Sequence, residues 1–247
     1  CRKRCKFCYF RVYTDKNSDQ IQTYLDALAN EVEYYARQPA IGDRPLHFIY
    51  FGGGTPSFIG SRHLRALVDR LKDVMPWDQA AEVAFECEPG TLTKAKLDAI
   101  REIGVTRLSL GLENLNDEIL HHNGRAHVSK EIYQAMPWVK ELGFDQVNVD
   151  LIAGMVGETW EYWRDTVQKT IDLDPDSVTV YQMELPYNTV YSKDLLAGDG
   201  EAIPLADWKT KRAWHAYAFA QFSAAGYVRS SAYTMKKKSE DSFVYRD

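Results

Sequence analysis

The sequence predicts an α/β fold: an open partial (β/α)6 barrel of parallel strands, followed by a C-terminal extension of helix and strand. Short runs rich in β-branched and aromatic residues alternate along the chain with amphipathic stretches of helical period. Such alternation implies parallel strands joined by right-handed crossovers. Five strand patterns follow the first cysteines, and a sixth strand is expected upstream of Cys1. Six strands are too few to close an eight-stranded barrel, so we expect an open, curved sheet.

The strand predictions are Leu46–Phe51, Glu82–Cys87, Thr106–Gly111, Gln146–Ile152 and Ser177–Met183. Helical periodicity is found in Ser18–Gln38, Arg62–Val74, Lys94–Ile103, Ser129–Leu142 and Glu158–Leu173. Ser18 and Thr93 are residue types that favour helix N-caps, whereas Gly104 and Gly143 are typical of helix ends. In an open β/α sheet, functional groups are expected at the carboxyl ends of the strands.

The pattern changes after residue 185. A long helix is expected over Leu205–Ala225, and the basic run Lys236–Lys238 is expected to be a solvated loop. We therefore expect the partial barrel to occupy residues 1–185. The extension, the start of a truncated accessory domain, would occupy residues 186–247.

Composition limits the functional classes. The chain has 247 residues, of which 45% are hydrophobic, and a formal net charge of −5. This charge argues against a nucleic-acid binder or a membrane-surface protein, since both classes carry a basic excess. No apolar run approaches the roughly 20 residues of a membrane span. Three of the four cysteines lie within the first eight residues, which favours a metal or cluster in a reducing compartment, and we expect a cytoplasmic protein.

The cysteine spacing is Cys1-x3-Cys5-x2-Cys8. Three thiolates can hold three irons of a cubane cluster and leave the fourth iron open to a small molecule. The alternative is a structural zinc ion, which normally takes a fourth protein ligand from a second pair of Cys or His residues. No such pair lies near the loop in the sequence. The spacing therefore favours an iron–sulfur cluster over zinc.

This loop, with the aromatic Phe7 just before the last cysteine, resembles the cluster loop of the radical S-adenosylmethionine (SAM) superfamily. The run Gly52-Gly53-Gly54-Thr55-Pro56 follows a predicted strand, and a glycine run there lets a ligand approach the backbone. The resemblance implies that Gly53, Gly54 and Thr55 contact the amino group of the SAM methionine. It also gives the expected barrel its type, that of the radical SAM fold.

Further strand ends carry acidic residues. Alternation in Glu82–Cys87 puts Phe85 and Cys87 on one face and Glu86 and Glu88 on the other. A buried glutamate needs a partner, and the hydroxyls of a ribose would serve. The stretch from Glu86 to Thr91 (ECEPGT) resembles the family segment whose first Glu holds the SAM ribose, so the resemblance assigns that role to Glu86 and leaves Cys87 as a core thiol.

The resemblance also implies roles at four later positions. Arg125, in NGRAH, would pair with the SAM carboxylate. Asp150 ends a predicted buried strand and matches a family aspartate at the SAM site. Ile152, in DLIAG, matches the backbone position that meets the adenine. Glu113 stands where the related families usually carry Gln.

The resemblance is most specific for the branch that contains oxygen-independent coproporphyrinogen III oxidases and heme chaperones, on the phrases YFGGGTP, ECEPGT, RLSLGLENLNDEIL, NGRAH and VNVDLIAG. It implies a [4Fe-4S] cluster that reductively cleaves SAM to a 5′-deoxyadenosyl radical. The radical would abstract hydrogen from a tetrapyrrole-like or other organic substrate. An electron donor such as flavodoxin or ferredoxin is then expected, and no catalytic residue is assigned.

Two departures from the branch keep alternatives open. The oxidases carry a fourth cysteine two places after the third, where this chain has Phe10. The heme chaperones carry a His-Asn motif near the position of Tyr245-Arg246. The alternatives are a heme-binding and heme-delivering protein, and a methyltransferase or cyclase that uses a second SAM. A third alternative is a zinc-stabilised β/α protein.

Overall fold

The computed structural model describes residues 1–42, 44–75, 77, 79–197 and 204–238, and a single mixed sheet forms its centre. The parallel part of the sheet contains β1 (Phe48–Phe51), β2 (Glu82–Cys87), β3 (Arg107–Glu113), β4 (Gln146–Ala153) and β5 (Ser177–Gln182). These strands lie side by side in chain order. The five strand predictions are therefore confirmed, each to within two residues at either end.

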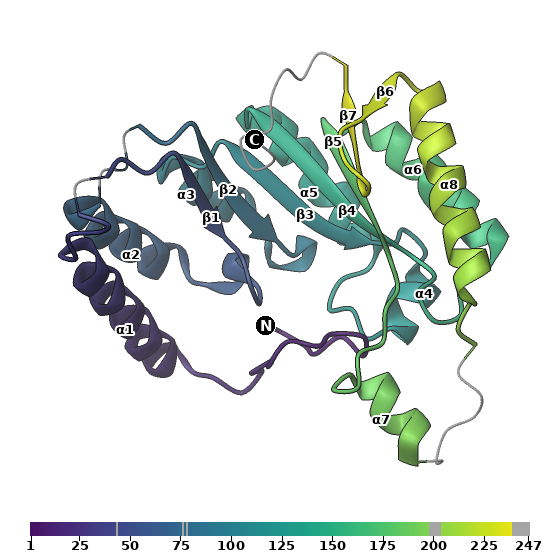
Figure 1. Ribbon diagram of the computed structural model, residues 1–247, viewed down its shortest axis with the longest axis horizontal. Coiled ribbons are helices and arrows are strands. Elements are labelled where there is room, and N and C mark those ends of the chain that lie inside the picture. The colour runs from purple at the N-terminus through teal and green to yellow at the C-terminus, as the bar shows by residue number, and fades with distance from the viewer. Residues whose placement is uncertain (43, 76, 78, 198–203, 239–247) are drawn as a thin grey trace.

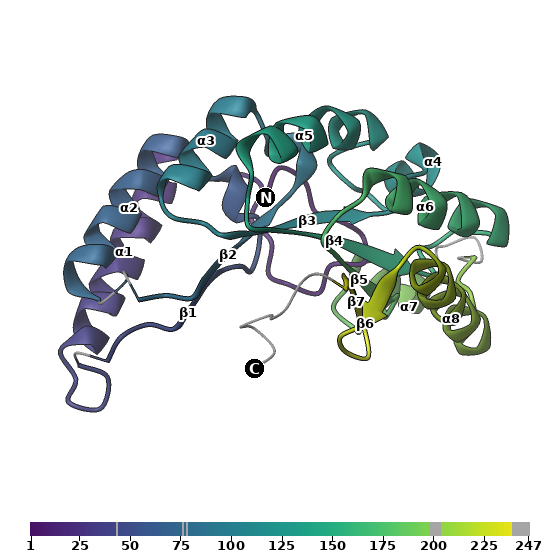
Figure 2. The ribbon, with the colours of Figure 1, turned by 90° about the horizontal axis from the view of Figure 1, so that it is seen from above.

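The helices are α1 (Ser18–Ala36), α2 (Ser61–Val74), α3 (Lys94–Glu102), α4 (Asp117–His122), α5 (Ser129–Leu142), α6 (Trp160–Leu173), α7 (Val190–Ala197) and α8 (Trp208–Ala224). Helices α1, α2, α3, α5 and α6 lie along one side of the curved row of strands (Figure 2). This arrangement confirms the predicted α/β fold with an open, curved sheet. Helices α4 and α7 were not among the sequence predictions, because α4 has six residues and the periodicity of α7 is weak.

The predicted caps are partly right. Thr93 caps α3 by accepting a hydrogen bond from the Lys96 amide, and Gly143 ends α5 in the left-handed conformation with φ +60°. The Ser18 prediction is wrong by one residue. Asn17 is the cap of α1, because its side chain accepts from the Gln20 amide while the Gln20 side chain accepts from the Asn17 amide.

The C-terminal extension continues the same sheet. Strand β7 (Thr234–Lys237) pairs antiparallel with β5, and β6 (Tyr227–Arg229) pairs antiparallel with β7. The expectation of a solvated loop at Lys236–Lys238 is therefore wrong, since Lys236 is buried in β7 and Lys237 pairs with Asp174 at 3.0 Å. The division of the chain at residue 185 stays a prediction, as does the strand upstream of Cys1. No helix among the described residues is long and apolar enough to cross a membrane.

Alternation along the strands separates an apolar face from a polar one. Val83, Phe85 and Cys87 of β2 belong to the core that the outer helices cover. On the other face, strand register places Glu86 beside Ser109, Ser109 beside Asn148, and Gly111 beside Asp150. The sheet therefore carries a row of polar side chains on its concave face, and the N-terminal segment passes beneath the strand ends (Figure 1).

Candidate cofactor site

A cavity of about 740 Å³ lies at the carboxyl ends of the parallel strands. All twelve residues that sequence reasoning proposed as ligands line it, namely Cys1, Cys5, Phe7, Cys8, Gly53, Gly54, Thr55, Glu86, Glu113, Arg125, Asp150 and Ile152. They come from six separate segments of the chain, so the fold brings together what the sequence keeps apart. The role of each residue toward a ligand stays a prediction.

The cysteine loop (Cys1–Cys8) presents its three thiols to this cavity, and all three are free and half-buried. The Thr55 hydroxyl donates to Cys1 Sγ at 3.1 Å, and Arg125 Nη1 donates to Cys5 Sγ at 3.4 Å. In the described part of the chain, no three His, Cys, Asp or Glu side chains gather tightly enough to hold one metal ion. A cubane spreads its thiolates over separate irons, so thiols that share a cavity without converging on one point fit a cluster.

The glycine turn after β1 lies next to the loop. Gly53 has φ +106°, a conformation that side-chain-bearing residues rarely adopt, and its amide donates to Glu86 Oε2 at 3.1 Å. A Cβ atom on Gly54 would lie 3.5 Å from Cys1 Sγ. The missing side chains thus keep open the space beside Cys1, where a ligand could reach the backbone.

Glu86 faces this turn from the end of β2, as predicted. Besides the Gly53 amide, it accepts a hydrogen bond from the Tyr50 hydroxyl. Burial raises the pKa of Glu86, and the two donors lower it by a smaller amount. Tyr50 was not anticipated, because a single tyrosine in a four-residue apolar strand gives no sign of a polar role.

Two more carboxyls and one guanidinium lie at the ends of β3 and β4. Burial raises the pKa of Glu113 to about 7 and that of Asp150 to about 6. Arg125 Nη1 lies 3.5 Å from Glu113 Oε1, and Arg125 Nη2 donates to the Gly111 carbonyl at 2.6 Å. Glu113 itself has φ +63°, at an irregularity in the pairing of β3 with β4. Such strain in a non-glycine residue is typical of functional sites.

The charged side chains of the cavity and one hydrogen-bond donor without a partner indicate which kind of ligand the cavity can bind. Three carboxyl side chains, those of Glu86, Glu113 and Asp150, line the cavity, and Arg125 pairs with Glu113 alone among them, which favours a ligand that carries positive charge. Arg125 Nε is buried and has no hydrogen-bond partner among the described residues, so it is available to a carboxylate. A zwitterionic amino acid with an additional cationic centre, as in SAM, has both features. The residues present therefore fit a three-cysteine cluster with SAM.

The remaining predicted residues form the apolar end of the cavity. Phe7 and Ile152 pack against a small hydrophobic cluster of Ile119, Met155 and Met183. Tyr181, Trp208 and Tyr233 also line the cavity and are each about half exposed, and Tyr181 lies beside Ile152 in the pairing of β4 with β5. The cavity thus combines a polar region near the cysteines with apolar and aromatic walls.

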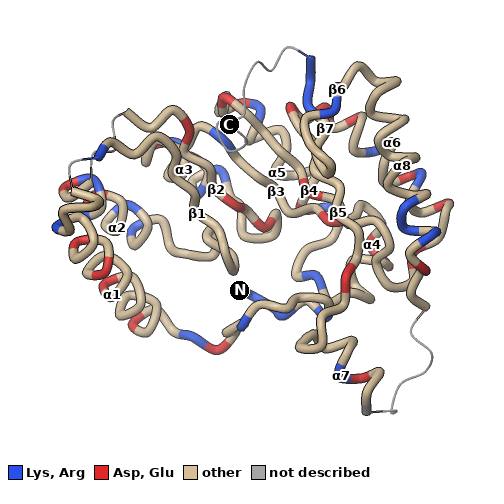
Figure 3. Tube along the Cα trace, viewed as in Figure 1, with Lys and Arg blue, Asp and Glu red and all other residues tan. Residues whose placement is uncertain are grey.

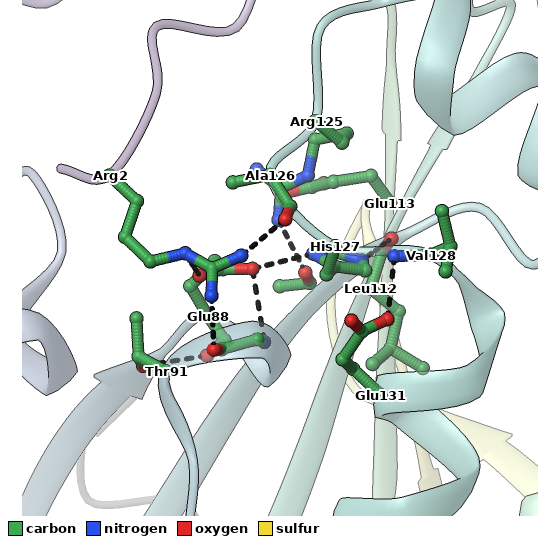
Figure 4. A network of polar contacts seen from close by, with 12 residues as sticks. Arg2, Glu88, Thr91, Leu112, Glu113, Arg125, Ala126, His127, Val128 and Glu131 are labelled. Atoms are coloured by element: carbon green, nitrogen blue, oxygen red, sulfur yellow. Dashed lines mark hydrogen bonds and ion pairs between the residues drawn. The ribbon is translucent and has the colours of Figure 1, made fainter.

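Three residues that sequence reasoning did not assign also lie at the site. His127 Nδ1 donates to Glu88 Oε1 at 2.9 Å, and Arg2 Nε lies 3.7 Å from Glu88 Oε2 (Figure 4). Glu88 shares the strand face of Glu86, which was a usable signal. Nothing in the spacing of the cysteine loop singled out Arg2. Basic residues of the N-terminal segment lie opposite acidic residues near the ends of the central strands (Figure 3).

Known proteins are similar to this chain in sequence and in fold. Residues 1–170 match the family model described as the radical SAM superfamily. The chain is 29% identical over 213 residues to the oxygen-independent coproporphyrinogen III oxidase of Synechocystis sp., covering 85% of this chain and 45% of that protein. It is 31% identical over 192 residues to the heme chaperone HemW of Bacillus subtilis, covering 77% of this chain and 50% of the chaperone.

The fold is similar to that of a solved structure, coproporphyrinogen III oxidase (HemN) from Escherichia coli. The TM-score is 0.86 at 24% identity, covering 98% of this chain and 54% of the oxidase. The chain thus spans about half the length of the curated relatives that it matches. On the family match over residues 1–170, the chain belongs to the radical SAM superfamily.

Proposed function

We propose that this chain is a radical SAM enzyme that acts on a tetrapyrrole-like or other organic substrate. The observation that carries the proposal is the meeting of three unpaired loop cysteines with Glu86, Arg125 and Asp150 in one cavity. Membership of the superfamily implies a [4Fe-4S] cluster and SAM. When bound, these cofactors supply an electron and, by cleavage of SAM, a 5′-deoxyadenosyl radical that abstracts hydrogen.

The cysteine thiolates of the chain would hold three irons. Thr55 and Arg125 donate hydrogen bonds to two of the sulfurs, and such contacts orient ligands and tune their basicity. Both hydrogen bonds are made by side chains of this chain.

The other cavity residues would hold SAM by its separate chemical parts. Glu86 would accept from the ribose hydroxyls, and Arg125, with its unused Nε donor, would bind the carboxylate. Gly53 and Gly54 would let the methionine amino group approach the backbone. Phe7 and Ile152 would shield the adenine from water at the apolar end.

A heme chaperone is the second candidate, and one residue favours it. The cysteine loop continues to Phe10, which lies at the cavity wall with its ring 4.6 Å from that of Tyr9. The branch resemblance puts a fourth cysteine at this position in the oxidases. The similarity to HemW agrees with this candidate. Tyr245 and Arg246, at the place of the chaperone His-Asn motif, lie outside the described residues.

Anaerobic reconstitution with iron and sulfide, followed by a SAM cleavage assay with a chemical reductant, tests the proposal. We expect release of 5′-deoxyadenosine, abolished in Cys5→Ala together with most of the bound iron. Cys87→Ala is the matched control, because Cys87 packs in the core, and it should keep its iron. Heme uptake without SAM cleavage would support the chaperone instead. Retention of zinc when iron is offered would contradict both.

A further inference from the structure

The segment Asn123–His127, which we call the loop bracket, lies directly against the cysteine loop. The Lys6 amide donates to the Asn123 carbonyl at 3.0 Å, and the Arg2 guanidinium donates to the Ala126 carbonyl. Both contacts join backbone atoms of the bracket to residues between the cysteines. Both contacts are made by protein atoms alone, so the protein itself contributes to the shape of the cysteine loop.

The two segments also lie close together at Gly124. This residue has φ +75°, and a Cβ atom there would lie 3.3 Å from both the Arg4 carbonyl oxygen and the Lys6 nitrogen. A side chain at this position would therefore be strained and would push against the cysteine loop. Glycine lets the loop sit close enough to form the Lys6 hydrogen bond.

The first end of the bracket is fixed by Asn123, which is fully buried. Its side-chain amide donates to the carbonyls of Ile119 and Val156, at 2.8 and 2.9 Å. Its side-chain oxygen accepts from the Val156 amide at 3.1 Å and from the Tyr191 hydroxyl at 3.3 Å. These bonds join the bracket to α4, to the turn after β4 and to α7.

The second end is fixed by His127, whose side chain has no exposed surface. Nδ1 donates to Glu88 Oε1 at 2.9 Å, and Nε2 lies 3.3 Å from the Leu112 carbonyl oxygen (Figure 4). The carboxylate of Glu88 also pairs with Arg2, which donates to the Gly90 carbonyl as well. Glu88 therefore connects the fixed end of the bracket to the first residue after Cys1.

We propose that the loop bracket is a preformed support that holds the metal-free cysteine loop in its ligand-binding shape. Gly124, His127 and Arg2 are its positioning residues. The inference goes beyond the proposed function, because it concerns the shape of the loop before any cofactor binds. Preorganised ligands bind a metal group without a further ordering cost. Loosening the bracket should therefore weaken iron uptake as well as loop order.

Gly124→Ala tests the bracket, and Gly143→Ala is its matched control. Gly143 has a similar backbone, with φ +60°, but nothing lies within 4 Å of a Cβ placed there. Hydrogen exchange of the Lys6 amide is measured in the metal-free full chain. We expect about tenfold faster exchange in Gly124→Ala, because there the strain of a left-handed alanine falls directly on the cysteine loop. The control should leave Lys6 exchange unchanged, and the core amide of Leu110 reports global unfolding in both variants.

Arg2→Ala and Arg2→Lys provide a second pair, because the half-exposed Arg2 side chain is not needed for the core. Loss of the guanidinium should speed Lys6 exchange and reduce iron bound on reconstitution at limiting iron. Lysine should restore part of both, since it can donate to the Gly90 and Ala126 carbonyls. Either of two results would overturn the proposal. The first is that Gly124→Ala and its control show equal Lys6 exchange and iron uptake. The second is that Arg2→Ala and the unmodified chain do. Neither readout uses SAM, so failure here is distinct from failure of the proposed enzyme activity.

Discussion

The two sides of the cavity are built differently. On the cysteine side, Arg125 and Glu113 keep only 11% and 14% of their side chains exposed, and both are tied into hydrogen bonds or an ion pair. On the aromatic side, Tyr181, Trp208 and Tyr233 are 46%, 48% and 49% exposed. The cysteine side, which we also call the ordered side, carries charged and hydrogen-bonding groups that can bind one small polar ligand. The aromatic side offers a broad apolar surface. The residues of the cysteine side therefore support the proposed cofactors. The aromatic side does not identify a particular substrate.

The largest effect is expected on the ordered side. Arg125→Ala should weaken SAM binding by about 10- to 100-fold, because a charged hydrogen bond is worth about 1.5–3 kcal/mol and Glu113 loses its partner. Anaerobic calorimetry with the reconstituted protein measures the affinity. Arg101→Ala, which removes an exposed pair with Asp145, should bind SAM as the unmodified chain does. Equal SAM affinity in all three proteins would remove Arg125 from the site.

Glu86→Gln should have the next largest effect. The amide keeps the size of the side chain but loses the charge that the Gly53 amide and the Tyr50 hydroxyl stabilise. We expect SAM binding about tenfold weaker, with the cluster spectrum unchanged. Glu102→Gln serves as a control, because Glu102 pairs with Arg65 at the exposed surface. A normal affinity in Glu86→Gln would contradict the ribose role.

A smaller effect should come from pH. Glu113 and Asp150 have pKa values raised by burial to about 7 and about 6, so both are partly protonated at pH 6 and largely ionised at pH 8. A cationic ligand binds the ionised forms better, so SAM affinity should rise a few-fold from pH 6 to 8, with protons released on binding. Calorimetry in buffers of different ionisation enthalpy measures this release. Binding with no proton release at pH 6.5 would show that SAM does not face these carboxyls.

The same pKa values determine how stability changes with pH. For each carboxyl, the pKa in the folded protein is higher than in the unfolded chain. Its protonated form therefore contributes stability that is complete below the unfolded value, about 4. That contribution is lost as pH rises through about 6 for Asp150 and about 7 for Glu113. We expect Asp150→Asn to reduce the loss of melting temperature between pH 5 and 8, measured on the metal-free chain. An unchanged pH dependence would contradict the burial argument.

The smallest effect is expected on the aromatic side. Tyr233→Leu removes a ring that stacks on Tyr181 at 6.0 Å. SAM affinity should stay within about twofold of that of the unmodified chain, as for most surface substitutions. A large loss of SAM affinity would show that the two sides of the cavity are not separate. Binding of a conjugated organic substrate is the property that this variant should weaken.

Several residues of the cysteine side could be proposed from the sequence because their signals are local, and their roles toward a ligand stay predictions. The cysteine spacing, the glycine turn and the face of Glu86 are each visible within a few residues. The contacts of Arg2 with Ala126 and of Lys6 with Asn123 join residues more than 100 positions apart, and no periodicity reports such pairs. The strand at Lys236 was missed for a related reason, since only pairing with β5 orders it. The aromatic side resisted assignment, because core packing and ligand binding use the same residue types.

The proposed function requires that Cys1, Cys5 and Cys8 hold a [4Fe-4S] cluster that binds SAM, and the most direct test is the electron paramagnetic resonance spectrum of the reduced, anaerobically reconstituted chain. We predict a [4Fe-4S] signal that changes when SAM is added. In Arg125→Ala, the same signal should need a much higher SAM concentration to change. A cluster signal that SAM leaves unaltered in the unmodified chain would contradict the account.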